Sequence, residues 1–142
     1  MTLKPETSAG YLTNHAARLF ARMAEERLRP LEVGTGYLPV FFALARGEAL
    51  TQAALVKIVG IEQPTMAATL TRMERDGLVR RQPDPNDRRS ALVTLTPLAL
   101  GKLPAIEAAI NAVNAAALAP LSGGERRQFL KLLATVIEAL GG

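Results

Sequence analysis

The sequence contains no cysteine and only one histidine, His15, among its 142 residues. Without cysteine there can be no disulfide bond, no thiol-based redox sensing and no cysteine nucleophile. A single imidazole without thiols builds a transition-metal site only when several carboxylates join it. The chain also lacks a glycine-rich phosphate loop and any cluster of histidines or carboxylates. We therefore expect no metal, no cofactor and no enzymatic activity.

Long apolar runs are missing as well. The first ten residues, MTLKPETSAG, lack the apolar segment of a signal peptide, and no stretch approaches the ~20 apolar residues of a membrane helix. The absence of cysteine is compatible with a reducing compartment. We expect a soluble, cytoplasmic protein without membrane association.

Apolar residues and arginine are abundant. Hydrophobic residues make up 49% of the chain, which argues against disorder, and much of that share is alanine and leucine, which favour helix. The length suits a single domain over residues 1–142. A net charge of +4 favours polyanionic partners, and its distribution is uneven. The arginines of one short block are Arg72, Arg75, Arg80, Arg81, Arg88 and Arg89.

Residues 51–59 have the pattern of a short helix. Thr51 can cap its first turn, and Gly60 can end it in a left-handed conformation. Its expected apolar face consists of Ala54, Leu55 and Ile58. The next three residues turn the chain into a second helix, so the block predicts a helix-turn-helix.

The second helix has two faces of different chemistry. Pro64 suits its first position and Gly77 the position just past its end. Met66, Leu70 and Met73 form an apolar stripe, which is typical of a helix packed on a core. The opposite face is small, hydroxylated or cationic, and consists of Thr65, Ala68, Thr71, Arg72 and Arg75.

That second face fits the major groove of DNA. Small residues permit close approach, hydroxyls reach phosphates or bases, and arginine can bind guanine through two hydrogen bonds. We add Thr51 and Gln63, which lie at the starts of the two helices, to the predicted DNA contacts. The alternative for an isolated helix is an ordinary solvated face.

Two strands are expected next, at residues 78–81 and 91–96, joined by a polar loop over residues 82–90. Arg88 and Arg89 in this loop can enter a minor groove, whose negative potential attracts guanidinium groups. The alternative is a local ion pair of either arginine with Asp87, which contributes little to stability.

Amphipathic helices flank this block. We expect helices at residues 9–28 and 37–45, then a long helix at 97–118 and a last helix that follows a capping box formed by Ser122 and Glu125. The two C-terminal helices carry more apolar surface than one compact lobe needs to cover. Residues 9–30 and 97–140 are therefore predicted to form dimerisation helices around a DNA-binding lobe at 37–96. The alternative is a monomer with a helical cap.

Several motifs resemble the MarR family of bacterial winged-helix transcription regulators. They are LTQ at 50–52, IEQPT at 61–65, RMERDGLVRR at 72–81, DPNDRR at 84–89 and VTLT at 93–96. The resemblance is dense over residues 50–96, and the DPNDRR loop before the VTLT strand is its most specific part. Many relatives carry a larger or basic residue where this chain has Ala68, which places more weight on Thr65, Thr71 and Arg72.

The resemblance implies a mainly α (α+β) fold, a winged helix-turn-helix with N- and C-terminal dimerisation helices. It implies a nucleoid-associated homodimeric repressor that binds a pseudo-palindromic duplex and responds to aromatic carboxylates, phenols or other lipophilic effectors. The candidate ligand-binding residues are His15, Arg18, Tyr37 and Phe41, with Arg18 available to a carboxylate. His15 could instead be a structural hydrogen-bonding residue. The alternative function is a winged-helix protein-interaction module without operator binding.

Overall fold

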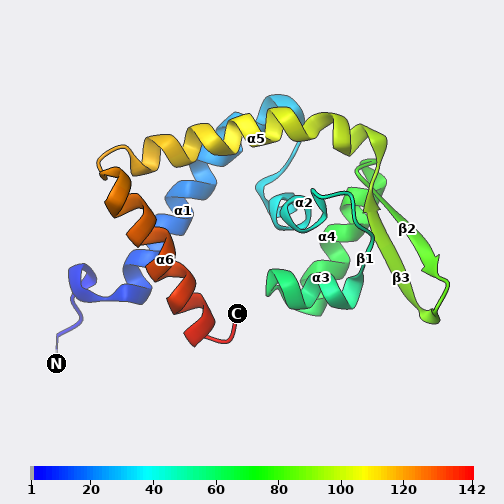
Figure 1. The fold of residues 1–142 in the computed structure, drawn as a ribbon, viewed down its shortest axis with the longest axis horizontal. Coiled ribbons are helices and arrows are strands. Elements are labelled where there is room, and N and C mark those ends of the chain that lie inside the picture. The colour runs from blue at the N-terminus through cyan, green and yellow to red at the C-terminus, as the bar shows by residue number, and fades with distance from the viewer. Residues whose placement is uncertain (1) are drawn as a thin grey trace.

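The structure is a computed structural model that describes residues 2–142. A long helix, α5 (Pro97–Leu118), runs along one side of the molecule and connects two parts (Figure 1). At one end lie α1 (Ala9–Leu28) and α6 (Gly123–Ala139), and at the other a lobe of three helices and a small sheet. The lobe contains α2 (Leu38–Leu44), α3 (Gln52–Val59) and α4 (Gln63–Arg75). This is the expected mainly helical arrangement.

Local capping sets most helix ends where the sequence predicts them. The side chain of Thr96 accepts a hydrogen bond from the backbone N–H of Ala99 and begins α5. Ser122 and Glu125 form the predicted capping box at the start of α6. The expected position of Pro64 is wrong by one, because α4 begins at Gln63 and Pro64 is its second residue. Short 3-10 helices lie at Pro5–Thr7 (η1), Arg29–Leu31 (η2) and Thr35–Tyr37 (η3).

The core of the lobe forms where α2, α3 and α4 meet the sheet. The predicted stripe of α4, Met66, Leu70 and Met73, is fully buried. The predicted burial of Ile58 is wrong, since it is 61% exposed, and Phe42 is also exposed, at 66%. In α3 the chain instead buries Leu55 and packs Val56 and Val59 against the core, while the core residues of α2 are Val40, Phe41 and Leu44.

The sheet has three antiparallel strands in the order β1-β3-β2. Strands β2 (Val79–Asp84) and β3 (Asp87–Leu95) are longer than expected, so the predicted loop over 82–90 shrinks to the two-residue turn at Pro85 and Asn86. Strand β1 (Leu50–Thr51) was not predicted, because its pairing with Leu92 and Val93 is a long-range contact. The hairpin of β2 and β3 projects from the lobe as a wing (Figure 1).

The helices outside the lobe leave apolar side chains in solvent. Helix α1 packs on α5 through its second half, where Ala24 and Leu28 are buried. Earlier along the same helix, the large apolar side chains of Leu12 and Leu19 are exposed. Within residues 2–142, α6 buries none of its residues. Its exposed apolar side chains include Phe129, Leu130, Leu132, Val136 and Ile137.

In the described part of the chain, no single helix is long and apolar enough to cross a membrane. Helices α5 and α6 satisfy that test only as a pair, with a bend of 108° between them.

Candidate nucleic-acid interface and effector cleft

Helices α3 and α4 form a helix-turn-helix whose turn depends on one glycine. Thr51 Oγ1 accepts a hydrogen bond from the N–H of Ala54 at 3.0 Å and begins α3. Gly60 ends α3 with a φ of 75°, a conformation that costs glycine little. Glu62 precedes α4 in an extended conformation, so α4 leaves the turn in a new direction. Because the hydroxyl of Thr51 serves the cap and the residue is half-buried, its geometry is that of a structural residue.

The predicted DNA-facing side of α4 is exposed along its length. Gln63, Thr65, Ala68, Thr71, Arg72 and Arg75 are all exposed, opposite the buried methionines and leucine. Arg72 and Arg75 occupy its last turn, one helical turn apart. A partly cationic helix face of this kind can lie against a polyanion, with its small residues permitting close approach.

Thr71 has contacts that the sequence did not suggest. Its hydroxyl donates to the carbonyl oxygen of Ala67 at 2.9 Å and accepts a hydrogen bond from Arg81 Nη2 at 3.0 Å. Arg81 Nε lies 3.9 Å from Glu74 Oε2 and is otherwise without a hydrogen-bond partner in the residues described. Arg81 therefore connects the wing strand β2 to α4. The sequence gives no indication of this contact beyond the presence of two adjacent arginines on one predicted strand.

A second contact ties the end of α4 to the segment before α2. The hydroxyl of Tyr37 donates to Asp76 Oδ2 at 2.7 Å, and Arg75 Nε donates to Asp76 Oδ1 at 3.2 Å. The hydrogen bond from Tyr37 holds the pKa of Asp76 below its usual value, and Arg75 acts in the same direction. Burial and the bond to Asp76 raise the pKa of Tyr37. Tyr37 therefore contacts the end of α4, outside the cleft.

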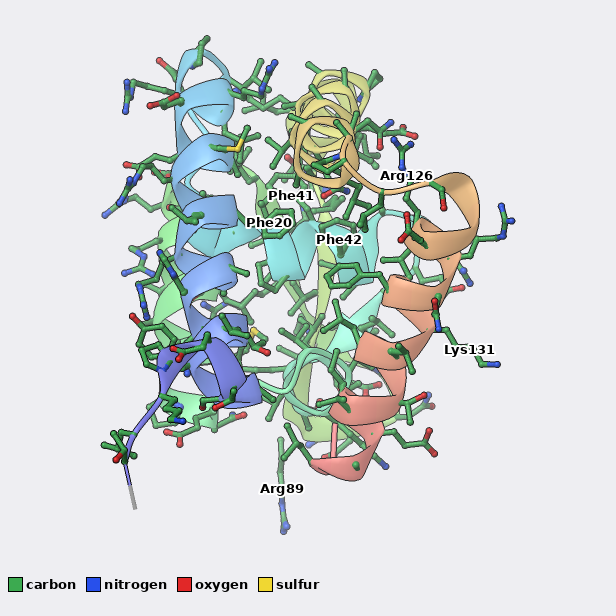
Figure 2. All side chains as sticks on the ribbon, turned by 90° about the vertical axis from the view of Figure 1, so that its left-hand side faces the viewer. Phe20, Phe41, Phe42, Arg89, Arg126 and Lys131 are labelled. Carbon is green, nitrogen blue, oxygen red and sulfur yellow. The ribbon has the colours of Figure 1, made fainter. Side chains whose placement is uncertain are left out.

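The wing holds its two tip arginines on β3. Arg88 and Arg89 are exposed, and Figure 2 shows Arg89 extending away from the body of the protein. Asp87 Oδ1 accepts a hydrogen bond from the backbone N–H of Arg89 at 2.9 Å. Asp87 forms no ion pair with either arginine within residues 2–142, so the alternative of a local ion pair is wrong. The aspartate shapes the turn, and both arginines remain exposed.

An apolar cleft lies between α2 and α5. It consists of two cavities of about 400 and 370 Å³ that share Phe42 and Ile110. Figure 2 shows Phe20, Phe41 and Phe42 gathered around α2, beneath α5. The polar side chains in the lining are Thr35, Glu107, Asn111 and Asn114, and Glu107 is the only charged residue among those lining the two cavities.

The four candidate ligand residues do not come together. Phe41 lines the cleft, whereas Tyr37 is hydrogen-bonded to Asp76 and lines a different, polar depression. His15 and Arg18 are exposed on the first half of α1 and line none of the cavities found in residues 2–142. His15 instead contacts Tyr11 edge to face, with the ring centroids 6.2 Å apart. Spacing on one helix does not reveal how far along α5 that helix packs, so the sequence could not show that these four residues lie apart in this structure.

Comparisons with known proteins agree with this geometry. Residues 34–90 match the MarR family model. A probable transcriptional regulator from Pseudomonas aeruginosa is 26% identical over 94% of this chain and 99% of its own, with a TM-score of 0.83. PcaV from Streptomyces coelicolor, solved with its natural ligand, is 25% identical over 99% of both chains, with a TM-score of 0.86.

A third structure shares the fold at lower identity. It is a putative MarR-family regulator from Listeria monocytogenes in complex with a 26mer DNA, 18% identical over 94% of this chain and 89% of its own, with a TM-score of 0.86. These matches are to transcriptional regulators, which are not enzymes. Residues 34–90, which contain the helix-turn-helix and the first part of the wing, thus match the MarR family model, and nearly the whole chain has the winged-helix fold of solved MarR-family transcriptional regulators.

Proposed function

We propose that the protein is a homodimeric, sequence-specific repressor that acts on DNA in the bacterial cytoplasm and is released by a small lipophilic ligand. The observation that carries the proposal is α4, whose one side is fully buried and whose other side is exposed and bears Arg72 and Arg75. The wing places Arg88 and Arg89 in solvent on the same lobe. One helix in a major groove and one hairpin over the adjacent minor groove is a docking geometry that such a lobe supports.

A second copy of the chain is the partner that best explains the exposed apolar helices. Helix α6 exposes at least five large apolar side chains, and α1 adds Leu12 and Leu19. Exposed apolar area on this scale marks an interaction site. A two-fold dimer presents two recognition helices about one DNA turn apart, roughly 34–36 Å, and so selects a pseudo-palindromic site.

A titration at several salt concentrations tests DNA binding. We expect the affinity for random duplex, measured by fluorescence anisotropy, to fall steeply with salt because bound phosphates release counterions. Arg72→Ala should weaken binding, and Arg22→Ala, a matched change on the exposed side of α1, should not. No binding, or a response independent of salt, would favour the protein-interaction module. Sedimentation of the same samples tests the dimer.

The cleft supports a ligand with an apolar body and no negative charge. Its walls include Phe41, Phe42 and Ile110, and its only charged group is the carboxylate of Glu107. A carboxylate ligand would meet no cation there, because Arg18 lies elsewhere. A ligand that binds one arrangement of α2 and α5 better than another would change the spacing of the two lobes and weaken both half-site contacts.

A thermal-shift series separates these ligand classes. Neutral phenols should raise the melting temperature more than benzoates of equal size, because at equal concentration the ligand that binds more tightly stabilises the folded state more. Glu107→Gln should reduce this discrimination, and Glu138→Gln, an exposed glutamate of α6 that lines neither cavity, should not. A larger shift with benzoates in the parent chain would contradict the proposed ligand class.

A further inference from the structure

Tyr37 lies where three parts of the molecule meet. It is the last residue of η3, and η3 packs on both α1 and α4. Its side chain is 9% exposed, and its hydroxyl reaches Asp76, 39 positions along the chain, at the end of α4. Glu25, Glu32 and Arg72 line the same depression. A buried phenol that donates its hydrogen bond to the end of α4 can influence the orientation of groups there.

The carboxylate of Asp76 uses a different oxygen for each of its two partners. Oδ2 accepts from the Tyr37 hydroxyl at 2.7 Å, and Oδ1 accepts from Arg75 Nε at 3.2 Å. Both bonds can therefore exist together. The bond from Tyr37 restricts rotation of the Asp76 carboxylate, and Arg75 is bound to that same carboxylate. Hydrogen bonds to an ionised carboxylate are stronger than those between neutral groups.

Arg75 presents the rest of its guanidinium to solvent. Its side chain is 69% exposed, and the recorded bond uses Nε alone. The two terminal nitrogens make no hydrogen bond to a protein group within residues 2–142, so both remain available as donors. An arginine held in one rotamer before binding loses less side-chain entropy on contact than a mobile one.

We propose that Tyr37 is a positioning residue for DNA binding, acting through Asp76 to hold Arg75 in the orientation that contacts a phosphate. This inference rests on the proposed function. It assigns to DNA binding a residue outside the helix-turn-helix and wing. It also gives Asp76 a use beyond ending a helix, since a carboxylate beside a DNA-facing arginine would otherwise only compete with phosphate for it.

A double-mutant cycle tests the inference. Tyr37→Phe keeps the buried ring and removes only the hydroxyl. We expect it to weaken operator binding by roughly 3- to 10-fold, the range of moderate coupling between neighbouring groups. In the Arg75→Ala background the same change should cost less than about 2-fold, because the positioned group is gone. Tyr11→Phe, a matched change at an exposed tyrosine, should leave affinity unchanged.

A titration tests the contact independently of DNA. The chain has two tyrosines and no tryptophan, so Tyr11→Phe leaves Tyr37 as the only phenol absorbing near 295 nm. Burial and Asp76 raise the pKa of Tyr37, and we expect ionisation above the usual ~10. Asp76→Asn should shift this ionisation to lower pH, because the negative neighbour is lost. Circular dichroism at each pH verifies that the chain remains folded.

Two results would overturn the inference. One is an equal loss of affinity from Tyr37→Phe with and without Arg75, which would make Tyr37 a general support of the lobe. The other is an ionisation of Tyr37 that does not respond to Asp76→Asn. Failure of the parent chain to bind any duplex overturns the proposed function and, with it, the role in DNA binding, whereas normal parental binding with either result overturns only the role of Tyr37.

Discussion

Arg81 Nη2 donates a hydrogen bond to Thr71 Oγ1 at 3.0 Å and so joins the wing to the middle of the recognition helix. Thr71 in turn donates to the carbonyl oxygen of Ala67 in the preceding turn of α4. The hydroxyl that the helix pattern assigns to DNA is therefore already used inside the lobe. This contact holds the two DNA-facing elements, helix and hairpin, at a defined separation.

Thr71→Val should affect stability more than base preference. The change keeps the shape of the side chain and removes the partner of Arg81, so we expect the free energy of unfolding to fall by about 1 kcal/mol in a denaturant titration. Thr65→Val is the matched control on the same exposed side of α4 and should change stability by less. An altered base preference in selected duplexes, with stability intact, would show instead that Thr71 contacts a base.

Arg72→Ala should change specificity. If Arg72 forms two hydrogen bonds to a guanine, its loss should cost ~1–3 kcal/mol of binding free energy and relax the preference at one position in each half-site. Selection from a random duplex pool, with parent and variant side by side, measures both effects. Equal losses on every duplex would assign Arg72 to phosphate contact.

Arg89→Ala should weaken binding most where the flanking sequence is rich in A and T. Such sequences have a narrow minor groove whose negative potential attracts an inserted guanidinium. Arg22→Ala, on the exposed side of α1 and outside the wing, is the control and should show no dependence on the flanks. The measurement compares the affinities of parent and variant for duplexes that differ only in their flanks. An equal loss of affinity on all flanks would show that the wing binds phosphates without regard to sequence.

Removal of α6 should abolish the dimer. A chain ending at Ala119 loses the exposed apolar row of α6 and uncovers the surface that row contacts in the proposed dimer. We expect monomers or insoluble protein in sedimentation experiments. A chain ending at Leu140 is the control, since it retains the whole of α6. A well-behaved dimer from the shorter chain would remove α6 from the interface.

The capping box of α6 should make the helix sensitive to acid. Ser122 donates its backbone N–H to Glu125 at 2.8 Å, and this bond lowers the pKa of Glu125 below its usual value. A depressed folded pKa stabilises the helix above the unfolded pKa of about 4.3 and ceases to do so as the pH falls through the folded value.

Far-UV circular dichroism between pH 6 and 3 measures this loss. The parent should lose helix as Glu125 becomes protonated, whereas Glu125→Gln should lack that component, because its side chain does not ionise. Glu138→Gln, in the last turn of the same helix, is the control and should behave like the parent. Identical acid profiles for the parent and Glu125→Gln would contradict the assignment.

Helix ends and helix faces could be predicted from the sequence because they depend on neighbours within four residues. Thr51, Thr96 and Ser122 each cap a helix through the backbone N–H three positions later. The buried stripe of α4 follows from 3.6 residues per turn in the same way. The DPNDRR motif also predicted the position of the wing tip. Strands β2 and β3 extend into this motif, although its polar composition suggested a loop.

The outcomes that the sequence did not predict depend on contacts between distant residues. Phe42 is apolar but exposed, because α2 turns that side toward the cleft and away from the core. His15 and Arg18 fall outside the cleft because α1 packs on α5 only through its second half. The bonds of Tyr37 to Asp76 and of Arg81 to Thr71 join residues 39 and 10 positions apart. Local patterning thus determined which elements form and which faces are apolar. Only the packing of those elements decided which polar groups meet, because a hydrogen bond requires its two atoms within about 3 Å.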